Sequence, residues 1–217
     1  MTVNVLITNE IPASGMDMLK AKYSVELGID YQKDRKAAII EKVKEKDVIL
    51  PLLTESIDSD IMDAAPKLKI ISNYAVGFNN VDLTAATERG ILVTNTPGVL
   101  TDTTADCAFA MMMASARRIP SSERYARAGK FKGWEPLGFL GQDIYGKTLG
   151  IVGFGRIGMG MAKRASGFDM KILYYDEYPA TKENEEKFNA MFVPLDDLLR
   201  QSDFISLHTP LTPTTHH

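Results

Sequence analysis

The stretch TLGIVGFGRIG, residues 148–158, decides the fold of the C-terminal half of this sequence. Residues 148–153 predict a strand, and Gly153, Gly155 and Gly158 form the pattern G-x-G-x-x-G at the start of a predicted helix over 155–167. In such a loop the first glycine permits a tight turn, the second lets a pyrophosphate approach the backbone, and the third lets helix and strand pack closely. Because free N–H groups at a helix N-terminus attract phosphate, we predict a dinucleotide-binding loop.

An acidic residue follows the next predicted strand, 171–175. Asp176 lies 18 residues after Gly158, where a carboxylate accepts a hydrogen bond from the adenosine ribose 2′-hydroxyl and repels a 2′-phosphate. Glu177 adds a second negative charge, and no Arg or Lys follows until Lys182. The sequence therefore predicts NAD rather than NADP as the cofactor.

The order of predicted elements around this motif favours two α/β domains. Residues 1–98 alternate five short apolar strands with helical segments, which is typical of a mostly parallel, flavodoxin-like sheet. A second alternation gives four strands, at 148–153, 171–175, 191–193 and 204–207, and predicts a Rossmann-type doubly wound domain over 99–217. Four strands are little more than half of a dinucleotide-binding sheet, so we expect this domain to be truncated in the chain.

The segment between the two alternations is expected to make contacts beyond its own domain. Residues 105–114 (ADCAFAMMMA) predict an apolar helix that is buried on every side, with its methionines and Cys107 as packing residues rather than metal ligands. No metal site is predicted. Residues 119–146 are rich in Gly and Pro, hold the single tryptophan, Trp134, and predict an irregular arm. We expect residues 100–146 to form the interface of a homodimer.

Composition excludes several classes of protein. The 217 residues are 45% hydrophobic and 24% charged, as in an ordinary globular protein, and the net charge of −3 without a polybasic tract argues against nucleic acid as a partner. The longest apolar run, 107–114, is far shorter than the about 20 residues of a membrane span. A single cysteine fits a reducing compartment, and we predict a cytoplasmic protein with no membrane partner.

Four segments, taken in order, resemble a known family. They are NYAVGFNNVD (73–82), NTPG followed by TAD (95–98 and 104–106), GKTLG leading into the glycine loop (146–150), and HTPLTP (208–213). On these segments the chain resembles the D-isomer-specific 2-hydroxyacid dehydrogenases, and the wording of the first is most similar to the glyoxylate/hydroxypyruvate reductase branch. The resemblance implies a first domain that binds the substrate, a second that binds NAD, and an active site between them.

The resemblance also implies roles for individual residues. The N–H groups of Val76 and Gly77 would hold the substrate carboxylate, and consecutive amides in a glycine turn are expected to form an anion nest. Leu53 would line the substrate pocket, although an ordinary apolar residue at a strand end explains it equally well. Thr104 would lie near the nicotinamide amide, or is simply a hydroxyl at a helix N-terminus. The remaining cofactor-binding residues implied are Arg156, Ile157, His208, Thr209, Pro210 and Thr214.

Reduction of a 2-oxo acid also needs a cation and a proton donor. The family uses an arginine and a histidine tuned by a glutamate, and none of His208, His216 and His217 matches that histidine. We therefore expect the catalytic residues C-terminal to His217 and assign none within the chain. The predicted function is NAD-dependent reduction of glyoxylate or hydroxypyruvate to the 2-hydroxy acid. The alternatives are an NAD-binding, corepressor-like regulator and a phosphoglycerate-type dehydrogenase.

Overall fold

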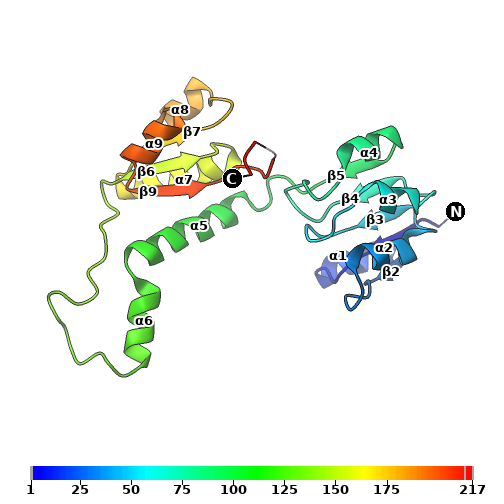
Figure 1. The fold of residues 1–217 in the computed structure, drawn as a ribbon, viewed down its shortest axis with the longest axis horizontal. Coiled ribbons are helices and arrows are strands. Elements are labelled where there is room, and N and C mark those ends of the chain that lie inside the picture. Colours follow the sequence, from blue (N-terminus) through cyan, green and yellow to red (C-terminus); the bar gives the residue numbers. More distant parts are fainter. Residues whose placement is uncertain (1, 213, 217) are drawn as a thin grey trace. The chain divides into compact units, whose positions relative to one another are not determined.

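The computed structural model describes residues 2–212 and 214–216. The chain divides into two compact units, Met1–Gly98 and Val99–His217, and each has its own parallel sheet (Figure 1). The α/β fold class predicted from the sequence is confirmed.

The first unit holds a five-stranded parallel sheet in the order β2-β1-β3-β4-β5, the strand order of the flavodoxin-like fold. Helices α2, α3 and α4 contribute to a core on one face of this sheet, and α1 packs on the other face. The strands are β1 (Asn4–Ile7), β2 (Ser24–Leu27), β3 (Val48–Leu50), β4 (Ile70–Ser72) and β5 (Leu92–Thr94). The helices are α1 (Ala13–Lys20), α2 (Arg35–Val43), α3 (Ser59–Asp63) and α4 (Leu83–Glu88).

Three aspartates fix where helices of the first unit begin. Asp34, Asp58 and Asp82 are the N-caps of α2, α3 and α4, and each carboxylate accepts a hydrogen bond from the N–H group three residues later. An N-cap of this kind stabilises a helix by about 1 kcal/mol. Because the helices start at fixed points, the preceding loops at the carboxyl ends of the strands are also fixed in length.

The second unit holds a four-stranded parallel sheet in the order β8-β7-β6-β9. This is the 3-2-1-4 part of the Rossmann strand order, with the switch point between β6 and β9. The strands are β6 (Thr148–Val152), β7 (Lys171–Tyr175), β8 (Ala190–Phe192) and β9 (Phe204–Leu207). The helices are α5 (Thr101–Ala116), α6 (Ile119–Arg127), α7 (Arg156–Ala165), α8 (Lys182–Phe188) and α9 (Leu195–Gln201), with a 3₁₀ turn at Ser166–Phe168.

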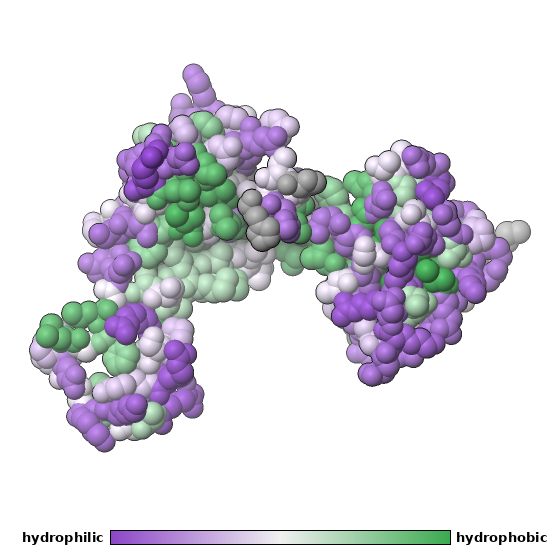
Figure 2. All heavy atoms as spheres, viewed as in Figure 1, coloured by the Kyte–Doolittle hydropathy of each residue, from purple (hydrophilic) through white to green (hydrophobic). Residues whose placement is uncertain are grey.

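Helix α5 packs closely against α7. A Cβ atom on Gly160 would lie only 3.1 Å from the Cβ of Ala105, and the guanidinium of Arg164 forms salt bridges with Asp102 and Asp106. The helix is buried on one side only: Phe109 and Ala116 are buried, whereas Met111 is 63% exposed and Cys107 is exposed. The expectation that this helix is buried on every side is therefore wrong for the single chain. Hydrophobic atoms along α5 are visible on the surface (Figure 2).

The predicted irregular arm, 119–146, contains one regular element. Helix α6 occupies its first nine residues, and 128–147 have no helix or strand. The stretch between β7 and β8, 176–189, contains α8. Among the residues that the structure describes, no helix combines the length and apolar character needed to cross a membrane.

Candidate functional site

The three glycines of the loop after β6 have three different surroundings. Gly153 has a φ of 92°, and a Cβ atom there would lie 2.6 Å from the carbonyl carbon of His208. A Cβ atom on Gly158 would lie 2.2 Å from the carbonyl oxygen of Gly153, whereas one on Gly155 would meet no atom within 4 Å. The first and third glycines therefore permit close packing, and the second leaves open space above the backbone. This is the arrangement that a pyrophosphate needs.

The same loop opens helix α7. Gly155 is its N-cap and offers no side-chain acceptor, so the N–H groups of the first turn, which include those of Arg156 and Ile157, are available to an anion. The side chain of Arg156 is exposed and that of Ile157 is half-buried. Both predicted pyrophosphate-binding residues thus lie at the helix N-terminus.

Asp176 lies at the carboxyl end of β7 and turns its carboxylate toward the glycine loop. Its Oδ2 accepts a hydrogen bond from the N–H of Phe154 at 2.7 Å, and its Oδ1 accepts one from the N–H of Tyr178 at 3.2 Å. The ring of Phe154 stacks on Tyr174, with ring centroids 4.2 Å apart. The residue predicted to bind the ribose is therefore held against the loop predicted to bind the phosphates, a contact that the sequence did not reveal.

The segment after β9 borders the glycine loop from the other side. The backbone N–H of His208 donates to the carbonyl of Val152 at 2.7 Å, and its Nε2 lies 2.8 Å from the Oγ of Ser206. Burial lowers the pKa of His208 below its ordinary value. Thr209, Pro210 and Thr214 are exposed. Pro213, part of the segment on which the family resemblance rests, lies outside the described residues.

Thr104 lies in the first half of α5 and is exposed. Its neighbour Ala105 is the residue that approaches Gly160 on α7. The structure therefore places Thr104 beside the contact with the helix that follows the glycine loop.

In the first unit, the predicted substrate residues lie on two loops that follow adjacent strands. Leu53 follows β3 and is 49% exposed, and Val76 and Gly77 follow β4. A Cβ atom on Gly77 would lie 3.6 Å from Cδ1 of Leu53. The structure thus brings Leu53 and Gly77 together, as expected of residues around one small substrate.

The backbone of this site differs from the expected anion nest. Positive φ angles are found at neither Val76 nor Gly77, so the left-handed residue that such a nest requires is absent there. The N–H groups of Val76 and Gly77 have no acceptor among the residues that the structure describes. Two adjacent, unpaired amides beside an exposed leucine still provide donors for a carboxylate.

Sequence reasoning missed the polar side chains beneath these loops, chiefly Glu55, Asn73, Asn80 and Asn95. The three asparagines lie in the segments 73–82 and 95–98, which carry the family resemblance but indicate no role for these side chains. The adjacency of β3, β4 and β5 brings them together. Within the described ranges, no group of three His, Cys, Asp or Glu side chains could hold a metal ion.

Comparison with known proteins identifies the family. Residues 109–217 match the model of the D-isomer specific 2-hydroxyacid dehydrogenase NAD binding domain. The chain belongs to the D-isomer specific 2-hydroxyacid dehydrogenase family. A glyoxylate reductase of Korarchaeum cryptofilum is 50% identical over 218 residues, which cover 100% of this chain and 65% of that protein. The chain thus spans about two thirds of the length of this curated relative.

Solved structures of the family agree with the fold. A protein from Thermus thermophilus has a TM-score of 0.90 and 42% identity, covering 99% of this chain and 67% of that one. D-Lactate dehydrogenase from Aquifex aeolicus, solved with NAD and lactic acid, has a TM-score of 0.85 and 28% identity, covering 99% of this chain and 63% of its own. The predicted family and its NAD cofactor are confirmed, and the open space above Gly155 and the carboxylate of Asp176 fit that cofactor.

Proposed function

We propose that this 2-hydroxyacid dehydrogenase reduces a small 2-oxo acid, glyoxylate or hydroxypyruvate, with NADH. The observation that carries the proposal is that the adjacent N–H groups of Val76 and Gly77, beside Leu53, have no acceptor in the part of the chain that the structure describes. Two amides suit a carboxylate, and the side chain of Leu53, whose Cδ1 would lie 3.6 Å from a Cβ atom on Gly77, offers an apolar surface to the substituent on C2. The identity to a glyoxylate reductase along the whole chain supports the same substrate class.

The proposed reaction converts glyoxylate, NADH and a proton into glycolate and NAD. NADH supplies the hydride that adds to the C2 carbonyl carbon. The residues of this chain bind and orient: Gly155 and the N-terminus of α7 receive the pyrophosphate, Asp176 receives the ribose, and Val76 and Gly77 hold the carboxylate. The proton donor and the cation that this reduction also needs are not assigned to residues of this chain.

The test is NADH oxidation by the gene product with glyoxylate, hydroxypyruvate and pyruvate as substrates. We expect turnover with the first two, and a much higher KM for glyoxylate in Gly77→Val with little change in NADH binding. The added side chain would press on Oδ1 of Asn79, 3.3 Å from the Cβ position, and on Leu53, while the NAD-binding unit is untouched. Absence of turnover with every 2-oxo acid would overturn the proposal.

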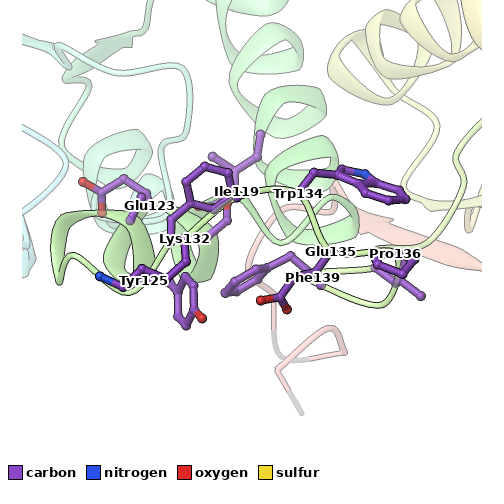
Figure 3. Close-up of a pocket in the computed structure, with 14 residues that line it drawn as sticks. Ile119, Glu123, Tyr125, Lys132, Trp134, Glu135, Pro136 and Phe139 are labelled. Atoms are coloured by element: carbon purple, nitrogen blue, oxygen red, sulfur yellow. The ribbon is translucent and has the colours of Figure 1, made fainter.

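We also propose that the protein is a homodimer through residues 100–146. A cavity of about 830 Å³ lies between α6 and the later part of the arm, 131–140, and apolar surface in it comes from Ile119, Tyr125, Trp134 and Phe139 (Figure 3). Trp134 is 84% exposed, and an apolar surface of this kind is typical of subunit contacts. Light scattering that finds only monomers at micromolar concentration would contradict this proposal.

For localisation, we propose the cytoplasm. The support is the single, exposed cysteine, Cys107, which has no partner for a disulfide within the chain. Cell fractionation with an antibody against the protein tests this directly, and recovery outside the cytoplasmic fraction would refute it.

A further inference from the structure

Buried polar side chains gather in one place in this molecule. Among the described residues, those that are polar and buried are Thr8, Glu55, Asn73 and Asn80, and all four lie in the first unit. Thr8 follows β1, Glu55 lies on the loop after β3, and Asn73 follows β4. Burying polar groups costs free energy unless they are hydrogen-bonded, so a cluster at the carboxyl ends of three strands needs a structural reason.

The cluster holds the backbone next to Leu53. Oε2 of Glu55 accepts hydrogen bonds from the N–H of Leu52 and from Oγ1 of Thr8, the latter at 3.0 Å. Nδ2 of Asn80 donates to the carbonyl of Leu52 at 3.2 Å. The N–H and the carbonyl of Leu52 are therefore both held by buried side chains of the cluster, and Leu53 follows directly.

The loop with Val76 and Gly77 is held through its carbonyl groups. The carbonyl of Ala75 accepts from the N–H of Thr96 at 2.9 Å, that of Val76 from Nδ2 of Asn95 at 2.8 Å, and that of Gly77 from Nδ2 of Asn73 at 2.8 Å. Asn73 and Asn80 also bond each other, Nδ2 to Oδ1, at 3.0 Å in both directions. Three consecutive carbonyls of this loop thus all accept hydrogen bonds from donors within the first unit.

This pairing decides where the N–H groups point. The chain has no cis peptide bonds among the described residues, and in a trans peptide the C=O and the following N–H point in opposite directions. With the carbonyls of Ala75 and Val76 turned toward their donors, the N–H groups of Val76 and Gly77 must point away from them. The same two N–H groups have no acceptor in the described structure.

We infer that Asn95 is a positioning residue, which aims the Gly77 amide at the carboxylate of the substrate. Asn73 holds the next peptide group of the same loop, and Glu55 and Asn80 set the distance of the loop from Leu53. The inference rests on the proposed function and adds to it the residues that determine recognition of the carboxylate. Neither asparagine touches the substrate. Each acts through the carbonyl that it holds.

The experiment uses Asn95, which is only half-buried and so tolerates substitution better than Asn73. Oxalate, a carboxylate that cannot be reduced, is titrated into the protein while the amide NMR signals of Val76 and Gly77 are followed. We expect these signals to shift in the wild type and the Kd for oxalate to rise about tenfold in Asn95→Ala, because one of two charge-assisted hydrogen bonds loses its direction. Asn79→Ala is the matched control, since the Asn79 side chain makes no hydrogen bond in the described structure, and it should bind oxalate like the wild type.

Kinetics separate this inference from the proposed function. In Asn95→Ala the KM for glyoxylate should rise about tenfold, with the KM for NADH and the melting temperature unchanged, and Asn95→Asp, which keeps the shape but cannot donate, should show a similar or larger effect. If the wild type reduces glyoxylate and both Asn95 variants match it, the inference is wrong and the function stands. If oxalate moves neither amide in the wild type, these amides do not bind carboxylate, whatever the protein reduces.

Discussion

Alanine at two glycines of the same loop should have opposite consequences. A methyl group on Gly158 would lie 2.2 Å from the carbonyl oxygen of Gly153 and 3.1 Å from Cγ2 of Ile151, so helix α7 and strand β6 would have to move apart. A methyl group on Gly155 would meet nothing, and the φ of −73° at this residue suits alanine. Gly158→Ala therefore tests the packing, and Gly155→Ala tests the open space.

The magnitudes follow from these contacts. Overpacking costs about 1–3 kcal/mol, and alanine in place of glycine in a helix returns up to about 1 kcal/mol, so Gly158→Ala should destabilise the second unit by about 1–2 kcal/mol. For a unit of this size that lowers the Tm by roughly 4–8 °C. Gly155→Ala should change the free energy of unfolding by less than about 1 kcal/mol, because a poorer N-cap and a stiffer unfolded chain offset each other. Its Kd for NADH should nevertheless rise at least about tenfold, because the methyl group occupies the approach of the pyrophosphate.

Scanning calorimetry and isothermal titration with NADH give both quantities for both variants. The reasoning is refuted for Gly155 if its alanine variant binds NADH as the wild type does. It is refuted for Gly158 if the melting temperature of its alanine variant is unchanged, because the close contact with Gly153 would then not exist in solution.

Four further predictions concern single side chains. The wild type should bind NADH at least about tenfold more tightly than NADPH, and Asp176→Ala should remove most of that difference; equal Kd values in the wild type would contradict the role of the carboxylate. Glu55→Gln should destabilise the first unit by about 1–3 kcal/mol in urea titrations, because an amide N–H₂ would face donors that now point at a carboxylate, and an unchanged midpoint would argue against this. Burial lowers the pKa of His208, so the unfolded chain binds a proton at this residue before the folded chain does as the pH falls. The contribution of neutral His208 to stability is therefore present above about pH 6.5 and is lost as the pH falls through the pKa of the folded state. His208→Gln should lose that part of the pH dependence of Tm, and identical pH profiles of Tm for the variant and the wild type would refute this. Leu137→Asp, on a residue that is 83% exposed, should convert dimers to monomers in light scattering without lowering the Tm of the monomer, whereas an unchanged dimer would place the interface elsewhere.

The sequence predicted what depends on local patterns. Short apolar runs bounded by Gly, Pro, Asn or Asp located the strands, and their alternation with helices predicted both parallel sheets. The glycine loop was also predictable, because turn, helix start and close packing all depend on neighbouring residues. The structure has the close contacts expected at Gly153 and Gly158 and the open space expected at Gly155.

Other elements were missed for identifiable physical reasons. The Gly and Pro residues of 119–146 predicted an irregular arm, yet proline is well tolerated in the first turn of a helix, and Pro120 lies there in α6. Helix α8 has no apolar periodicity and depends instead on Thr181, whose hydroxyl accepts a hydrogen bond from the N–H of Asn184. The exposure of Met111 on α5 could not be foreseen, because an apolar sequence does not say which molecule covers it.

The substrate loops show the limit of local reasoning most clearly. Val76 and Gly77 were found by resemblance, but the direction of their N–H groups depends on Thr96 and Asn95, which reach the loop only because β5 lies beside β4. The anion nest expected at Val76 and Gly77 was wrong, since φ is positive at neither residue. Contacts between loops that follow different strands become visible only when the strand order is known.

The close contact between Gly153 and the backbone of His208 also has a consequence for folding kinetics. This contact links the loop after β6 to the segment after β9, so the glycine loop is fully packed only when β9 has paired with β6. Closing so long a loop is entropically costly, and contacts of this kind form late. During refolding, secondary structure should therefore return before the capacity to bind the nucleotide. On the ribosome, the loop should stay incompetent until β9 has left the exit tunnel.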